Sequence, residues 1–242
     1  MSNLIRINNK LMTKNNKLLT ATAYVPPSPP VDPYNPLGLP SNTVRVRTSD
    51  GQVPYYVSSF TSYETATLVP GTTDIYDVYK SGTDFTGLLK YSVNVTEVLG
   101  ANTTGITSMD TMFAECSSLA SVPLFDTSSV TNMRSMFTVC SSLTSVPLFD
   151  TSSVTNMLQM LYNCSSLTAI PLFNTSSVTN MGSMCWHCIN VQSGALALYQ
   201  QASTQTNVPS HNDITFLDCG SNTTTGAAEL AQIPVSWGGT LE

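Results

Sequence analysis

Acidic residues at equivalent positions of a repeating pattern offer one catalytic chemistry. Asp126 and Asp150 are each followed by Thr-Ser-Ser and stand at the same point of two successive copies of the pattern. If equivalent positions are adjacent in space, their carboxylates approach about 5 Å, the separation that retaining glycosidases use. The third equivalent is Asn174, however, and an Asp in this context more simply accepts the hydrogen bonds of a turn or cap. We predict no catalytic residue, and a carbohydrate-active enzyme using Asp126 and Asp150 is an alternative hypothesis.

Four of the six cysteines recur at the same spacing as these acidic residues. They are Cys116, Cys140, Cys164 and Cys188. Each one falls on the apolar stripe of its repeat, and buried thiols commonly behave as small apolar side chains. We therefore predict a ladder of buried thiols along the inside of the molecule rather than disulfides.

A Cys-x-x-Cys motif, Cys185-Trp186-His187-Cys188, is of the kind used in redox and zinc sites. A zinc site would need a second pair of ligands, for which only His211 and Cys219 are candidates. Cys185 stands where the preceding repeats have Phe or Leu, so we predict that it fills the same core position. We expect neither a metal nor a cofactor.

Binding residues are best sought among the positions that differ between repeats. Positions 110, 114 and 115 and their equivalents point away from the invariant Met and Cys stripe, and toward the C-terminal end they become aromatic and uncharged. Such a surface suits stacking on a sugar or contact with a protein. Alternatively, these positions differ between repeats only because solvent-exposed residues can be exchanged freely, without any role in binding. The predicted binding residues are Tyr162, Trp186, His187, Arg134 and Asn163.

These candidates are positioned by an internal repeat of constant length, without insertions. Its copies are residues 107–130, 131–154 and 155–178, with a fourth that begins at residue 179. Apolar residues spaced by three and one predict a short helix, and alternation around a proline predicts a very short strand. One unit buries too little apolar surface to offset its backbone entropy, so the units must stack. Stacking predicts that Met133, Met157 and Met181 line up in one buried file. The predicted fold class is an α/β solenoid, a right-handed leucine-rich-repeat-like stack in which each unit is a short strand plus a short helix.

The repeat SSLxSVPLFDTSSVTNMxxMFxxC closely resembles the BspA-type leucine-rich repeat, which occurs in bacterial surface proteins and in virion proteins of tailed phages of gut bacteria. The resemblance covers about 95 residues strongly. It implies a structural and adhesion protein of a phage virion, such as a head or tail fibre, because the chain carries no export signal. A bacterial surface or scaffold repeat protein with no role in a virion is the alternative. It further implies a capsid or tail protein as partner, a host surface glycan or protein as target, and a homotrimer.

The flanking segments predict attachment and capping. Residues 1–24 hold alternating apolar positions typical of a hairpin or extended peg, and residues 25–42 are rich in proline, as in a semi-rigid spacer. A hairpin through Asp50-Gly51 is expected in a β-rich cap over 43–106, followed by repeats over 107–188. A mixed α/β cap is expected over 189–242, with helices near 194–202 and 226–232 and a strand around 214–217. The predicted attachment residues are Leu4, Ile5, Ile7, Leu11 and Leu18.

Composition excludes several classes of function. Only 10% of the residues are charged, 41% are apolar, and the net charge is −6. The negative net charge argues against non-specific electrostatic binding to nucleic acid or anionic lipid. The high apolar content argues against a disordered chain. We find no signal peptide and no run long enough to span a membrane, so we expect no membrane partner and a protein assembled in the host cytoplasm.

Overall fold

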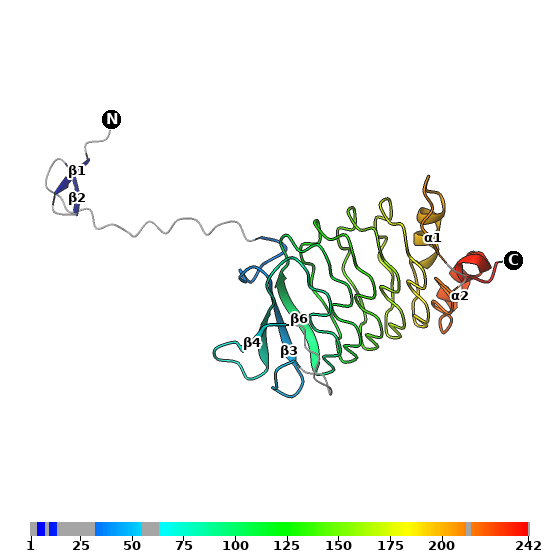
Figure 1. The fold of residues 1–242 in the computed structure, drawn as a ribbon, viewed down its shortest axis with the longest axis horizontal. Coiled ribbons are helices and arrows are strands. Elements are labelled where there is room, and N and C mark those ends of the chain that lie inside the picture. The colour runs from blue at the N-terminus through cyan, green and yellow to red at the C-terminus, as the bar shows by residue number, and fades with distance from the viewer. Residues whose placement is uncertain (1–3, 8–9, 14–31, 55–62, 212–213, 242) are drawn as a thin grey trace. The chain divides into compact units, whose positions relative to one another are not determined.

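The structure is a computed structural model that describes residues 4–7, 10–13, 32–54, 63–211 and 214–241. The chain divides into two compact units, residues 1–31 and 32–242. In the first unit, β1 (Leu4–Ile7) and β2 (Lys10–Thr13) pair antiparallel, with Leu4 opposite Thr13 (Figure 1). The expected hairpin is therefore confirmed for these strands, while Leu18 lies outside the described residues.

The second unit contains a four-stranded antiparallel sheet in the order β4-β5-β3-β6. Its strands are β3 (Thr43–Thr48), β4 (Thr65–Leu68), β5 (Ile75–Tyr79) and β6 (Val95–Asn102). Val44 and Val46 of β3 are fully buried, whereas Arg45 on the other face forms two hydrogen bonds of 2.6 and 2.7 Å with Asp77 of β5. β5 and β6 occupy both edges of β3, so the hairpin predicted through Asp50-Gly51 is wrong.

The predicted α/β solenoid of strand-plus-helix units is also wrong. In the described part of the chain, regular secondary structure consists of β1 and β2, the four-stranded sheet, α1 (Ala195–Ser203), α2 (Thr224–Leu230) and a 3-10 turn, Val235–Trp237. Residues 103–194 contain neither a helix nor a strand, only turns and isolated bridges. The regular structure is thus dominated by a small antiparallel sheet.

The reason that the repeats form no helix lies in where their backbone N–H groups bond. The Met136 N–H donates to Met133, three residues earlier, but the next N–H, of Phe137, donates to the carbonyl of Met160 at 3.0 Å. Ser135 has a φ of 51°, in the left-handed region, which a right-handed helix excludes. An α-helix needs every N–H to bond four residues back, and here alternate N–H groups bond the following repeat instead.

The predicted strand fails for a related reason. Residues two apart lie on the same face of a strand, but around Pro147 the Val146 side chain is buried and the Leu148 side chain is exposed. The proline has no N–H to donate to a neighbouring strand, and the Phe149 N–H turns back to the Pro147 carbonyl at 3.0 Å. The Phe173 N–H bonds the Pro171 carbonyl in the same way, at 2.9 Å, so these segments turn locally instead of pairing as strands.

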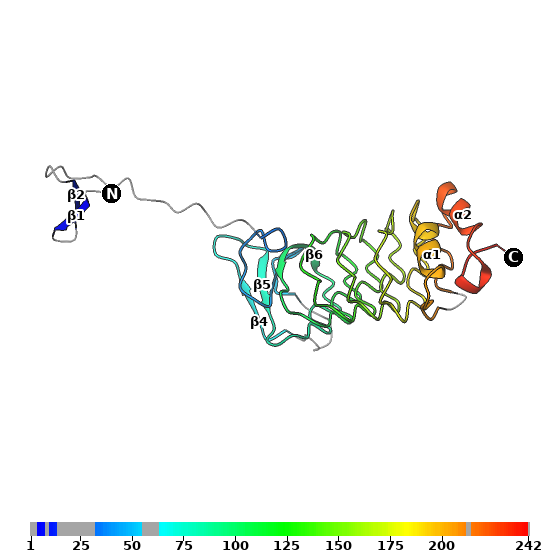
Figure 2. The ribbon, with the colours of Figure 1, turned by 90° about the horizontal axis from the view of Figure 1, so that it is seen from above.

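Equivalent residues of successive repeats are nevertheless neighbours. Parallel bridges join Ser108 to Asn132, Asn132 to Asn156 and Asn156 to Asn180, so each bridge advances by one repeat. Within this unit the sheet lies at one end of the row of repeats, and α1 and α2 lie at the other (Figures 1 and 2).

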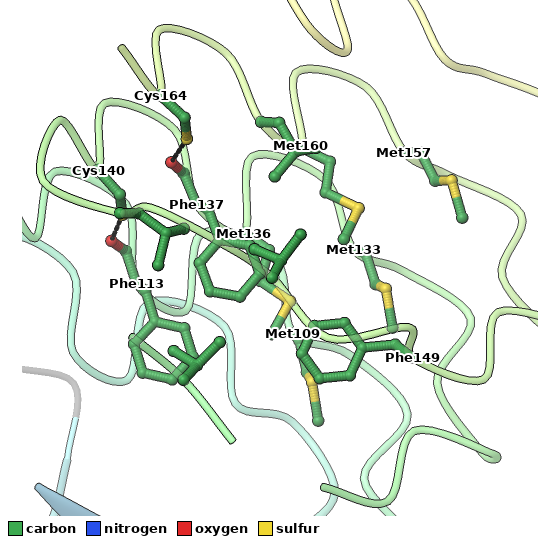
Figure 3. Close-up of a cluster of buried hydrophobic side chains, with 14 of the residues drawn as sticks. Met109, Phe113, Met133, Met136, Phe137, Cys140, Phe149, Met157, Met160 and Cys164 are labelled. Atoms are coloured by element: carbon green, nitrogen blue, oxygen red, sulfur yellow. Dashed lines mark hydrogen bonds between the residues drawn. The ribbon is translucent and has the colours of Figure 1, made fainter. Parts of the chain in front are cut away.

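The core runs through the row of repeats (Figure 3). Met133, Met157 and Met181 have no exposed surface, and Figure 3 shows Met109, Met133 and Met157 in one file. The rings of Phe113 and Phe137 stack with centroids 5.5 Å apart. The predicted buried file of methionines is confirmed.

The described part of the proline-rich segment is packed rather than extended away from the domain. Leu39 is buried, and its carbonyl accepts hydrogen bonds from the side chains of Asn35 at 2.9 Å and Asn102 at 2.8 Å. A side chain at Gly100 of β6 would meet Leu37, whose Cδ1 lies 2.8 Å from the Cβ position. Residues 32–42 thus lie against β6.

The C-terminal segment contains two expected helices and lacks an expected strand. α1 and α2 fall where helices were predicted, and Pro234 immediately precedes the 3-10 turn. The strand predicted around Ile214–Leu217 is wrong, because Thr215 and Leu217 accept backbone hydrogen bonds from Cys185 and His187 and so continue the turns of the repeats.

Candidate binding surface

The positions that differ between repeats are placed by a tight turn in each copy. In every repeat, the residue immediately before the recurring cysteine has a left-handed backbone conformation, and its N–H donates a hydrogen bond to a carbonyl of the following repeat. Because the turns are equivalent, their side chains form rows across the repeats. We call the following set the variable surface: Glu115, Thr138, Val139, Tyr162, Asn163, Trp186 and His187.

An aromatic pair is the main feature of the variable surface. Tyr162 and Trp186 are both half-buried, and their ring centroids lie 5.1 Å apart in an edge-to-face arrangement with an interplanar angle of 69°. Exposed His187 is the next residue, and the Asn163 N–H donates to the Trp186 carbonyl at 2.8 Å. The structure therefore brings together four of the five predicted binding residues.

Asp218 completes this cluster, and the sequence prediction missed it. Its Oδ2 lies 3.4 Å from Nδ1 of His187. Its backbone φ of 58° and the hydrogen bond from the His187 N–H to the Leu217 carbonyl place Asp218 in the row of Asn163 and His187. The segment Phe216-Leu-Asp-Cys repeats the Phe-x-x-Cys pattern, but it comes later in the chain than the constant repeat length would place it. A search that allowed an insertion in the repeat would have found it.

Arg134 does not join the aromatic pair. It is exposed, and its Nη1 lies 3.8 Å from Oδ2 of Asp110, the equivalent residue of the preceding repeat. In the register of the repeats Arg134 corresponds to Leu158, four residues before Tyr162. We therefore leave Arg134 outside the candidate site.

The predicted ladder of buried thiols is confirmed, and it carries hydrogen bonds that the sequence did not predict. Cys140 Sγ donates to the Phe113 carbonyl at 3.1 Å, and Cys164 Sγ donates to the Phe137 carbonyl at 3.0 Å (Figure 3). All six cysteines are buried free thiols. Burial raises the pKa of each thiol, to about 12 for Cys116 and Cys188. Thiols in this state are poor nucleophiles.

The Cys-x-x-Cys motif is part of the core. Cys185 has no exposed surface, and its N–H bonds the Thr215 carbonyl at 2.9 Å, just as the Phe137 N–H bonds Met160. It therefore fills the position of the phenylalanines, as predicted. His211 stacks on Trp237, with centroids 3.8 Å apart. In the described part of the chain, no three His, Cys, Asp or Glu side chains are grouped so that they could hold a metal ion.

The two carboxylates considered for catalysis form turn hydrogen bonds. Oδ1 of Asp126 accepts from the N–H of Ser128 at 3.0 Å and from its hydroxyl at 2.7 Å, and Asp150 accepts from Ser152 in the same way. The bonds from Ser152 lower the pKa of Asp150. A general acid in glycoside hydrolysis needs a raised carboxyl pKa, which is the opposite of what Asp150 has.

Comparison with known proteins supports the resemblance at the level of a family only. Residues 78–197, just under half of the chain, match the DUF285 family, described as a Mycoplasma protein of unknown function. This family is related to the BspA-like repeat proteins. The match gives no support to the virion and phage descriptions. No curated protein and no solved structure matches the chain. Neither helix of the described residues is long and apolar enough to cross a membrane.

Proposed function

We propose that the protein is a non-enzymatic structural and adhesion protein whose variable surface binds a glycan. The observation that best supports this proposal is the aromatic pair of Tyr162 and Trp186, which is bordered by His187 and Asp218. Aromatic faces provide apolar contact to a sugar ring, and their polar neighbours provide hydrogen bonds to its hydroxyls. The absence of Asp, Glu, Lys and Arg between Thr151 and Asn212 in the sequence favours a neutral ligand.

The glycan proposal is tested on a glycan array with the full chain. Trp186→Ala and Tyr162→Ala should each reduce binding at least tenfold, since aromatic contacts dominate the energy of such sites. Arg134→Ala is the matched control, because this exposed residue is paired with Asp110 and lies outside the cluster. Full binding by both aromatic variants would refute the proposal. Binding to a purified surface protein but to no glycan would identify a protein target instead.

The first unit is proposed to attach the protein to a larger assembly. Its paired strands β1 and β2 carry Leu4, Ile5, Ile7 and Leu11, the apolar residues suggested for docking, and Leu18 follows in the sequence. Deleting residues 1–24 should abolish incorporation of the protein into this larger assembly. The deletion should leave the thermal stability of residues 32–242 unchanged. Unchanged incorporation would exclude this role.

The finer form of the proposal is that the assembly is a phage virion and that the attached protein is a homotrimer. Its support is the resemblance of the repeats to the BspA-type repeats that occur in virion proteins of tailed phages. Mass spectrometry of purified particles against host lysate tests the location, and sedimentation equilibrium tests the trimer. Detection in lysate alone would indicate a cellular scaffold or surface protein.

A further inference from the structure

The variable surface is two residues wide, because each repeat contributes an adjacent pair to it. Toward its C-terminal end the pairs are Thr138-Val139, Tyr162-Asn163, Trp186-His187 and Leu217-Asp218. The N–H of the second residue of each pair donates to the carbonyl of the first residue of the next pair, at 2.8, 2.8 and 2.9 Å in chain order. These hydrogen bonds give the pairs an even spacing.

This spacing matches the repeat of one kind of polymer. Backbones joined by parallel hydrogen bonds lie about 4.7–4.9 Å apart, and the ring centroids of Tyr162 and Trp186 are 5.1 Å apart. In an extended β-1,4-linked glycan, each sugar advances the chain by about the length of one pyranose ring, which is close to the same distance. An α-1,4-linked chain coils instead. An extended glycan that lies along the pairs therefore places one sugar over each repeat.

The two aromatic rings contact neighbouring sugars in different ways. Their planes are 69° apart, so only one ring can lie flat against a sugar of the chain, while the other presents its edge. The carboxamide of Asn163 and the imidazole of exposed His187 provide donors and acceptors for the sugar hydroxyls beside the rings. The site thus combines stacking at one sugar with hydrogen bonds at the next.

Val139 gives an independent reason to extend the site beyond the aromatic pair. Its φ is 60°, in the left-handed region, which a β-branched residue adopts only at an energetic cost. The equivalent residue of the next repeat, Asn163, has a φ of 55°, and asparagine is one of the residues that adopt this conformation most readily. Backbone strain of this kind points to function. The half-buried valine offers an apolar contact that an asparagine does not.

The preceding repeat ends the site on the N-terminal side. Its pair is Ala114, which is buried, and Glu115, which is exposed, so it presents a carboxylate and no apolar side chain above the surface. At the C-terminal end, Oδ2 of Asp218 lies 3.4 Å from Nδ1 of His187. The pairs between these two limits define a site for a chain of four sugars.

We propose that the variable surface binds a linear, uncharged, β-1,4-linked glycan that lies across the repeats, with one sugar over each pair from Thr138-Val139 to Leu217-Asp218. This inference rests on the proposed glycan binding and names the class of glycan, an extended chain that is bound along its length and not by its terminal sugar. Tyr162 and Trp186 contact the two central sugars, and Val139 contacts the sugar on the N-terminal side.

Isothermal titration calorimetry of the full chain with oligosaccharides of two to six units tests the proposal. The probes are cello-oligosaccharides and N-acetylated chito-oligosaccharides, which are neutral and β-1,4-linked, and malto-oligosaccharides are the matched α-1,4-linked control. In at least one β-linked series, the Kd should fall about threefold or more with each added unit up to four, the effect of one further ring or apolar contact. It should then stay constant, and the malto-oligosaccharides should bind more weakly at every length.

Val139→Asn tests the path of the chain. This variant should weaken binding of the four-unit oligosaccharide and leave binding of the two-unit oligosaccharide unchanged, whereas Trp186→Ala should weaken both. Because asparagine adopts the left-handed conformation more readily than valine, Val139→Asn should not lower the melting temperature. A weaker affinity in this variant would then come from a lost contact with the glycan.

Three results would overturn the extended chain while leaving glycan binding intact. They are a Trp186-dependent Kd that is the same for two and four units, equally tight binding of the malto-oligosaccharides, and an unchanged Kd of the four-unit oligosaccharide in Val139→Asn. Glycan binding on an array without binding of either β-linked series would also overturn it. Absence of binding to any glycan would refute the proposed function itself, and this inference with it.

Discussion

Replacing Phe137 with alanine tests whether neighbouring repeats share one core. The Phe137 side chain has no exposed surface, and its ring stacks on Phe113 with planes 5° apart and lies 6.3 Å from the ring of Phe149. Removing a buried phenylalanine side chain costs about 3–5 kcal/mol. Loss of two aromatic contacts places Phe137→Ala toward the upper end of this range. This is a large share of the roughly 5–15 kcal/mol by which domains are stable.

Urea unfolding followed by circular dichroism measures the effect. Phe137→Leu should lose less than about 1.5 kcal/mol, because the next repeat already holds Leu161 in this position. Leu148→Ala should stay within about 0.5 kcal/mol, because this leucine is exposed. Equal losses for Phe137→Ala and Leu148→Ala would refute the shared core. A reduced urea dependence in Phe137→Ala would show that the repeats on either side unfold separately.

Three further outcomes follow from the same structure. All six thiols should resist an aromatic disulfide reagent in the native protein and react in urea, since burial raises their pKa values; modification of the native protein would contradict their burial. Asp150→Asn should change the free energy of unfolding by less than about 0.5 kcal/mol at pH 7, because Asn174 accepts the same turn bond. Because the pKa of Asp150 is lowered, its ionised carboxylate stabilises the fold at pH values above the ordinary carboxyl pKa. This stabilisation is lost as the pH falls through the lowered pKa. The difference in free energy of unfolding between Asp150→Asn and wild type should therefore shrink in acid. Gly194→Ala should lower the free energy of unfolding by more than about 2 kcal/mol, because the φ of Gly194 is +100° and the new Cβ would lie 2.1 Å from the Ile170 carbonyl oxygen. Gly71→Ala is the control, since no atom lies within 4 Å of its new Cβ. It should lose only about 1 kcal/mol of stability in thermal melts.

Core membership could be predicted from the repeat because equivalent residues align. The methionine and cysteine registers are buried throughout, and even Cys185 occupies the position that alignment gave it. Local backbone conformation could not be predicted. Apolar spacings of three and one fit a short helix and also fit tight turns with left-handed residues such as Ser135 and Val139. Which of the two forms depends on whether alternate N–H groups find carbonyls in the next repeat, and a single repeat does not encode that.

The candidate site was predicted in part for the same reason. Tyr162 and Trp186 occupy equivalent positions of adjacent repeats, so their contact follows from alignment. Asp218 follows an insertion that contains α1, and a repeat of fixed length did not reach it. Arg134 was grouped with the aromatic residues by its variability alone, although its partner in the structure is Asp110.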